Sequence, residues 1–275
     1  MSIRVVDEIQ IKTIKVGALT IDRLISHYVR SNEAAGKSPK TISWYRDILS
    51  QFSTHLKAEK FPPFLSSFRM ETIRDYIVYL LHKPRFKGHP HIPEKSELLS
   101  VRTVQCHVRT LKAFSSWLYE EGHTESNILR NLKLPKAPAK VMEPLTPTEI
   151  QVIIHSIDIH TNNGIRNQAM ITTLLDTGLR ASELTTIDLD RLNLKEGFIT
   201  VMGKGSKERV VPIGKYTVSI LLNYINSIRL KPASPDCNRL FLSPSGNLIT
   251  TNTVKLLFSR LAKNSGIQRL HAHLC

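Results

Sequence analysis

Apolar side chains in the first half of the chain recur every three or four residues, the spacing of one face of an α-helix. This spacing predicts four helices: one that begins after Thr20, one that begins at Ser38-Pro39, and two over residues 70–81 and 100–121. Thr20 and Ser38 are residue types that cap a first turn, and Pro39 suits the first helical position. The inward positions are Ile21, Leu24, Ile25, Tyr28 and Val29, then Ile42, Tyr45, Ile48, Leu49 and Phe52, and later Val104, Val108, Leu111, Phe114, Trp117 and Leu118. The pattern predicts a four-helix bundle around one apolar core.

The second half mixes helical spacing with short alternating segments. Thr146, Pro147 and Glu149 form the sequence signature of a capping box, and helices are predicted over residues 149–159, 164–175, 216–230 and 251–266. Residues 198–202 and 209–213 alternate as strands around a turn at 203–207, and a short strand at 240–242 would join them. The predicted fold class is therefore mainly α with a small antiparallel β-sheet, an α+β chain.

Proline and lysine gather between the two halves, at residues 133–145. Proline favours an extended linker, so we predict an N-terminal extension over 1–17, a helical domain over 18–132, this linker, and a second domain over 146–275. Residues 83–97, rich in Pro, His and Lys, are predicted to be a loop inside the helical domain.

The charge balance narrows the choice of partner. The 275 residues include 38 Lys and Arg against 23 Asp and Glu, a formal net charge of +15, which favours a polyanion such as nucleic acid. Three scattered cysteines, Cys106, Cys237 and Cys275, are too few for a disulfide framework and fit a reducing cytoplasm. We find no apolar run long enough to cross a membrane, and we expect a cytoplasmic protein with no membrane partner.

The stretch from Leu174 to Gly214 organises the second domain. Its apolar helix is predicted to end at Gly178, where a positive φ stops the helix, and Arg180 follows at the start of a short new helix. Backbone N–H groups at a helix start favour an anion, so a guanidinium there indicates a phosphate-binding position. The hairpin that follows carries further cations near its turn.

Together the runs TGLRASEL and GKGSKERVVPIG, with His273 after them, resemble the catalytic domain of the tyrosine recombinases, the phage-integrase and Xer-like enzymes that cut and rejoin DNA. The resemblance implies that the helical bundle is a SAM-like core-binding domain that clasps double-stranded DNA. It also implies that Arg180, Lys204 and His273 are catalytic. We interpret Glu183 as a structural support that orients a nearby cation, with a role as acid or base as the alternative.

The chemistry of strand exchange explains these residue types. A guanidinium fork can bond two non-bridging oxygens of the phosphate as negative charge builds there, which is the role we assign to Arg180. Lys204 would protonate the departing 5′ oxygen, with Lys207 as the competing candidate. His273 would bond the phosphate or assist proton transfer, with His271 as the competitor. A phosphotyrosyl link conserves the bond energy, so the family needs no cofactor, and the alternation of His271, His273 and Cys275 is too weak to indicate a metal site.

Further cations lie at helical spacing or beside the hairpin turn. These candidate DNA-binding residues are Lys40, Arg46, Arg102, Arg109, Lys112, Lys207 and Arg209. Any single cation on a helix could equally belong to the solvated face of an amphipathic helix, and Arg209 could lie along the sheet surface.

In the family a second arginine and the tyrosine nucleophile follow the histidine, but no tyrosine follows His273 in this sequence. We therefore expect a C-terminally truncated recombinase whose full-length form works as a tetramer on two DNA sites, while this chain binds DNA without cleaving it. The alternative is an inactive DNA-binding remnant that occupies recombination sites. An RNA-binding protein is disfavoured because no aromatic stacking motif is present.

Overall fold

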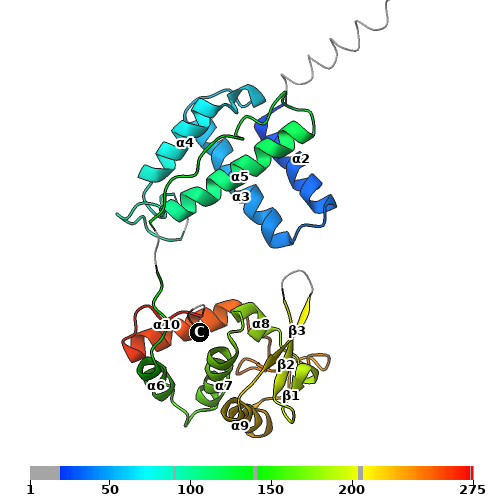
Figure 1. The fold of residues 1–275 in the computed structure, drawn as a ribbon, viewed down its shortest axis with the longest axis vertical. Helices are drawn as coiled ribbons and strands as arrows, with labels where there is room; N and C mark the ends of the chain where they lie inside the picture. Colours follow the sequence, from blue (N-terminus) through cyan, green and yellow to red (C-terminus); the bar gives the residue numbers. More distant parts are fainter. Residues whose placement is uncertain (1–18, 89–90, 139–140, 204–206, 273, 275) are drawn as a thin grey trace, which may run out of the picture. The chain divides into compact units, whose positions relative to one another are not determined.

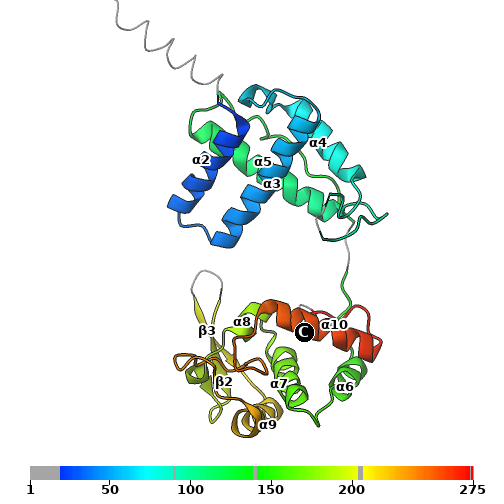
Figure 2. The ribbon, with the colours of Figure 1, turned by 180° about the vertical axis from the view of Figure 1, so that it is seen from behind.

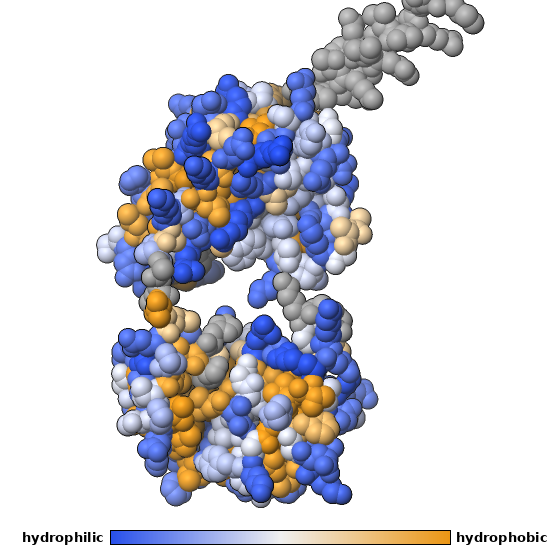
Figure 3. Space-filling view, viewed as in Figure 1, coloured by the Kyte–Doolittle hydropathy of each residue, from blue (hydrophilic) through white to orange (hydrophobic). Residues whose placement is uncertain are grey.

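The computed structural model describes residues 19–88, 91–138, 141–203, 207–272 and 274. The chain divides into two compact units, Met1–Lys140 and Val141–Cys275, which are described separately. Over the described residues, no helix is both long and apolar enough to cross a membrane. On the face drawn in Figure 3, hydrophobic and hydrophilic residues are interspersed on each unit.

The N-terminal unit contains the four predicted helices (Figure 1): α2 (Ile21–Ala34), α3 (Pro39–Ala58), α4 (Met70–His82) and α5 (Val101–Glu120). The hydroxyls of Thr20, Ser38 and Ser100 cap three of them by accepting a hydrogen bond from the backbone N–H three residues on. The helix positions predicted from apolar spacing are confirmed. The spacing was informative because each helix has one apolar face, and that face can be buried only against the other three helices.

Aromatic rings fill the centre of this unit. Phe68 packs edge-on against Phe52 and Phe114, and Tyr28 contacts the rings of Phe114 and Trp117. Such pairs add to the free energy gained by burying their surface.

A polar pair lies within the same core. The Tyr76 hydroxyl lies 3.2 Å from His107 Nδ1, and both side chains are buried. Burial, aided by the nearby Lys83, lowers the pKa of His107 to about 4, so His107 is neutral at pH 7.

The segment predicted as a loop after α4 has its two ends tied together. Arg85 N donates to Glu97 O at 2.8 Å, Leu99 N donates to Lys83 O at 2.9 Å, and the Arg85 guanidinium pairs with the Glu97 carboxylate at 2.6 Å. The ends of the loop are therefore held side by side on the unit's surface.

In the C-terminal unit, a three-stranded antiparallel sheet lies on one side of a central helix, and the remaining helices pack around these two elements (Figure 1). The helices are α6 (Pro147–His155), α7 (Asn162–Thr177), α8 (Ala181–Thr185), α9 (Lys215–Asn223), which continues as a π-helical turn over Tyr224–Ile228, and α10 (Thr251–Ser265). The strands are β1 (Leu192–Asn193), β2 (Phe198–Met202) and β3 (Glu208–Pro212), paired in the order β1-β2-β3. Figures 1 and 2 show α7 between α6 and the sheet, so α7 forms the centre of the unit's core.

The predicted third strand at 240–242 is wrong. The strand beside β2 is β1, with Leu192 opposite Ile199, whereas the later segment makes only isolated bridges, such as that between Leu242 and Leu248. Leu240, Phe241 and Leu242 are apolar because all three side chains are buried in the core, and not because they alternate across a sheet. A short continuous apolar run cannot by itself distinguish these two settings.

Candidate active site

The local backbone turns Arg180 outward. Gly178 ends α7 with φ +61°, the left-handed conformation that glycine adopts without strain, and its N–H donates to Leu174 O at 3.0 Å. Leu179 is then buried, and Arg180 precedes the first residue of α8 with its side chain 62% exposed. The predicted helix stop and the position of Arg180 at a helix start are both confirmed.

The carboxylate of Glu183 lies beneath Arg180 and is almost fully buried. It accepts from the backbone N of Arg180 at 2.8 Å and from Arg180 Nη1 at 3.0 Å. It also accepts from Arg209, with Nη1 on one oxygen and Nη2 on the other, both at 2.9 Å. Each oxygen therefore accepts two hydrogen bonds, which satisfies the carboxylate completely.

These contacts fix the charge of Glu183. The hydrogen bonds from Arg209, followed by those from Arg180, outweigh the effect of burial and lower the pKa of Glu183 to about 2. Glu183 is therefore ionised at neutral pH and offsets one of the two guanidinium charges. The three side chains together keep one net positive charge at the surface.

Arg180 remains available for an external anion. Among the contacts between described residues, its guanidinium makes a single one, from Nη1 to Glu183. Its exposed N–H groups can therefore form the paired bonds that a phosphate accepts from arginine. This arrangement is a fixed arginine held on a buried carboxylate.

Two of the predicted catalytic residues, Lys204 and His273, lie outside the described residues. Gly203 and Lys207 flank the first of them and are joined by a hydrogen bond from Gly203 N to Lys207 O at 2.8 Å. Both Lys207 and the competing histidine, His271, are exposed. Within the part of the chain that the structure describes, no group of three His, Cys, Asp or Glu side chains is placed to hold a metal ion.

The candidate DNA-binding cations of the N-terminal unit differ in their surroundings. Lys40 and Arg102 are exposed, Arg46 lies 3.7 Å from Glu33, and Arg109 lies 3.5 Å from the side-chain oxygen of Gln105. All four side chains lie at the surface, and their contact with DNA phosphates stays a prediction.

Lys112 has a structural role that its spacing did not reveal. Its ammonium donates to the carbonyls of Arg130 at 3.1 Å and Leu132 at 2.8 Å, so it ties α5 to the segment that leaves the helical unit. A phosphate contact from Lys112 would require these bonds to break.

Sequence reasoning missed two tertiary anchors of this region. Asp176 Oδ2 accepts from Gly214 N at 2.7 Å, which joins the end of α7 to the chain just after β3. Arg239 donates to the carbonyl of Thr186 and, at 2.9 Å, to Asp188, which fixes the chain after α8. Both join residues more than 35 positions apart, so no local pattern could have revealed them.

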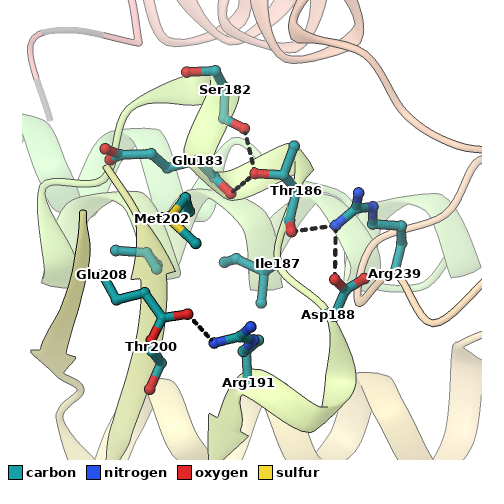
Figure 4. Close-up of a pocket in the computed structure, with 11 residues that line it drawn as sticks. Ser182, Glu183, Thr186, Ile187, Asp188, Arg191, Thr200, Met202, Glu208 and Arg239 are labelled. Atoms are coloured by element: carbon teal, nitrogen blue, oxygen red, sulfur yellow. Dashed lines mark hydrogen bonds and ion pairs between the residues drawn. The ribbon is translucent and has the colours of Figure 1, made fainter. Parts of the chain in front are cut away.

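Arg239 lines a surface pocket of about 410 Å³ beside α8 (Figure 4). Figure 4 shows the guanidinium of Arg191 directed at Glu208 and that of Arg239 directed at Thr186 and Asp188, with Ile187 between the two pairs. The guanidinium groups of Arg191 and Arg239 are thus each directed at an acceptor beside the pocket, and both side chains are less exposed than that of Arg180.

Comparison with known sequences matches residues 143–275 to the phage integrase family. The tyrosine recombinase XerD of Listeria innocua is 31% identical over 177 residues, which are 64% of this chain and 60% of that protein. The tyrosine recombinase XerC of Oceanobacillus iheyensis is 29% identical over 239 residues, which are 86% of this chain and 73% of that protein. The chain thus spans about 60% of the length of the XerD relative.

Solved structures share the fold of the chain. The Tn1549 transposon integrase in complex with transposon right end DNA aligns with a TM-score of 0.71 at 19% identity, covering 93% of this chain and 84% of that one. A lambda integrase dimer bound to a COC′ core site aligns with a TM-score of 0.66 at 16% identity, covering 93% and 86%. The family match, the relatives and the arginine held on a buried glutamate at α8 agree, and residues 143–275 belong to the phage integrase family, the tyrosine recombinases.

Proposed function

We propose that this protein binds double-stranded DNA and serves site-specific recombination by DNA strand breakage and rejoining, with Arg180 holding the phosphate that is attacked. The observation that carries the proposal is the exposed Arg180 guanidinium fixed on the buried, ionised Glu183. Support comes from the family match and from the XerC and XerD relatives, which are named tyrosine recombinases.

In the proposed reaction a tyrosine oxygen attacks the phosphorus and forms a 3′-phosphotyrosyl bond while the bond to the 5′ oxygen breaks. Arg180 lowers the barrier because its N–H groups bond the non-bridging oxygens, where negative charge builds in the transition state. Lys204 gives the leaving 5′ oxygen its proton, and His273 bonds the phosphate or assists proton transfer. A 5′ hydroxyl then attacks the phosphotyrosyl bond in the reverse sense, so rejoining needs no cofactor.

The tyrosines of the C-terminal unit do not fit the nucleophile. This unit contains Tyr216 and Tyr224. Tyr224 is 2% exposed, its hydroxyl accepts from Leu242 N at 3.4 Å, and burial raises its pKa, all of which oppose nucleophilic attack. Tyr216 lies exposed in the first turn of α9, and no hydrogen bond between described residues joins its hydroxyl to Arg180 or Glu183. We therefore propose that residues 1–275 bind DNA, and that cleavage requires a tyrosine that follows them in the full-length enzyme.

The proposed partners are double-stranded DNA and, for the full-length enzyme, three further copies of the chain in a homotetramer on two DNA sites. Lys40, Arg46, Arg102, Arg109 and Lys207 are the proposed phosphate contacts on the two units, while Lys112 and Arg209 would have to leave their internal partners to join them. The similar Tn1549 and lambda structures are of integrases bound to DNA, which supports this partner.

A covalent-trapping assay tests the proposal. This chain and the same chain extended by its downstream coding sequence are incubated with a nicked suicide duplex, and a covalent protein–DNA adduct is sought on a denaturing gel. We expect an adduct from the extended protein alone and none after Arg180→Ala, which should still bind the duplex with most of the binding free energy, at an affinity lowered about tenfold. Adduct formation by Arg180→Ala would contradict the role of Arg180. Duplex binding without an adduct from either parent protein would favour the inactive DNA-binding remnant.

A further inference from the structure

Arg209 lies on β3 opposite Val201 of β2, and its guanidinium reaches across to Glu183 on α8. Both terminal nitrogens of Arg209 bond the carboxylate, one on each oxygen, at 2.9 Å. Such a two-bond fork restricts rotation of the carboxylate, and it doubles the hold of Arg180, whose backbone N and Nη1 also reach one oxygen each. The orientation of Glu183 therefore depends in part on a residue 26 positions away on the hairpin.

The backbone beside this fork leaves space for it. A Cβ at Gly203 would lie 3.1 Å from Arg209 Nη1 and 3.3 Å from the carbonyl of Lys207, closer than ordinary van der Waals contact. Glycine at this position therefore gives the Arg209 guanidinium room to lie against β2 and meet Glu183. Gly203 thus serves the arginine fork as well as the hairpin.

We propose that Arg209 is a positioning residue that holds Arg180 toward the DNA phosphate by fixing Glu183, and that Arg209 does not itself contact the phosphate. The inference rests on the proposed function, since it assigns Arg209 a part in the phosphate site described above. Each Glu183 oxygen accepts one bond from Arg209 and one from Arg180, so both arginines are held by the same carboxylate. If Arg209 turned to a phosphate, the buried carboxylate would lose two of its four hydrogen bonds, a costly exchange.

The electrostatics agree with this geometry. Arg209 is the largest cause of the lowered pKa of Glu183, ahead of Arg180. Without Arg209, the buried carboxylate would keep only its bonds from Arg180, and burial would raise its pKa. Arg209 therefore helps to keep Glu183 ionised as well as oriented.

A double-mutant cycle on DNA affinity distinguishes positioning from direct contact. Dissociation constants are measured by fluorescence anisotropy with a labelled random-sequence duplex of about 30 base pairs over a range of salt concentrations. Arg180→Ala is expected to weaken binding about tenfold, and Arg209→Ala about fivefold. In the Arg180→Ala background, Arg209→Ala should produce no further loss, because the side chain that it positions is already gone.

Three further variants complete the cycle. Arg209→Lys should behave like Arg209→Ala, because lysine keeps the charge but cannot form the two-bond fork. Lys207→Ala, the removal of an exposed cation near Arg209, should weaken binding by the same factor in both backgrounds. Arg191→Ala, which breaks an exposed pair with Glu208 on the same sheet, should leave affinity unchanged and controls for general loosening of the sheet. Equal losses from Arg209→Ala in both backgrounds, or wild-type affinity in Arg209→Lys, would overturn the proposal.

A measurement on DNA-free protein separates failure of this inference from failure of the proposed function. If the parent chain does not bind the duplex, or Arg180→Ala leaves affinity unchanged, the proposed phosphate site is wrong, but the coupling between the arginines can still be measured. In protein labelled with ¹⁵N-arginine, the Nε–H signal of Arg180 is assigned by its loss in Arg180→Lys. We expect Arg209→Lys to increase the mobility of this group on the ps–ns timescale while far-UV circular dichroism is unchanged. An Arg180 signal that does not respond to Arg209→Lys would overturn the positioning role whatever the protein binds.

Discussion

Replacing Glu183 with glutamine should destabilise the C-terminal unit, and the structure sets the size of the effect. The carboxylate has its pKa lowered from 4.5 to about 2. At 1.36 kcal/mol per unit of pKa, this lowering corresponds to at most about 3 kcal/mol of folding free energy. Arg180 and Arg209 are 62% and 40% exposed, so solvent screens their charges, and we expect a loss of about 1–2 kcal/mol at pH 7.

The pH dependence follows from the direction of the shift. Because the folded-state pKa is below the unfolded one, the contribution of Glu183 is fully present above pH 4.5 and is lost as the pH falls toward 2. Glutamine does not titrate. The difference in free energy of unfolding between the parent chain and Glu183→Gln should therefore shrink below pH 4.5.

Urea denaturation can assign the change to one unit. The only two tryptophans of the sequence, Trp44 and Trp117, lie in the N-terminal unit, so their fluorescence follows that unit alone. Far-UV circular dichroism follows both units. Glu183→Gln should move the circular dichroism transition to lower urea and leave the fluorescence transition in place.

Glu208→Gln is the matched control, because it removes an exposed partner of Arg191 on the same sheet and should cost less than about 0.5 kcal/mol. The predicted contribution of Glu183 would be refuted if both variants lost the same free energy, or if the loss in Glu183→Gln were as large at about pH 3 as at pH 7.

Three further changes probe single features. Burial lowers the pKa of His107 from 6.5 to about 4, so the N-terminal unit should lose stability as the pH falls from 6.5 toward 4, and His107→Gln should reduce that dependence in the tryptophan-fluorescence transition. Gly178→Ala places a side chain at φ +61° with no clash within 4 Å, so backbone strain alone should cost about 1 kcal/mol in the circular dichroism transition. Thr146→Ala removes the hydroxyl that accepts from Glu149 N at 3.2 Å and should lower the free energy of unfolding by about 1 kcal/mol in the same measurement. Thr146→Ser keeps a hydroxyl and should retain most of this stability.

Features that depend on neighbouring residues could be predicted from the sequence. The capping box at Thr146 and Glu149, the left-handed glycine at Gly178 and the hairpin strands all follow from patterns within a few residues. The helices of the N-terminal unit follow from a regular apolar spacing that admits one buried face. Arg180 was predicted by the same means, because the residues before and after it determine both the helix stop and the new helix start.

Tertiary structure alone decided which distant side chains meet. The pairing of Glu183 with Arg209, and that of Arg239 with Thr186 and Asp188, joins segments whose separation in the chain carries no periodic signal. The apolar run at 240–242 likewise became buried core instead of sheet, since burial on all sides and pairing in a strand select the same residue types. The sequence by itself thus determined the helices, the turns and the position of Arg180, because these follow from local sterics and hydrogen bonding. How Arg180 is held depends on a carboxylate and a second arginine that only the folded chain brings together.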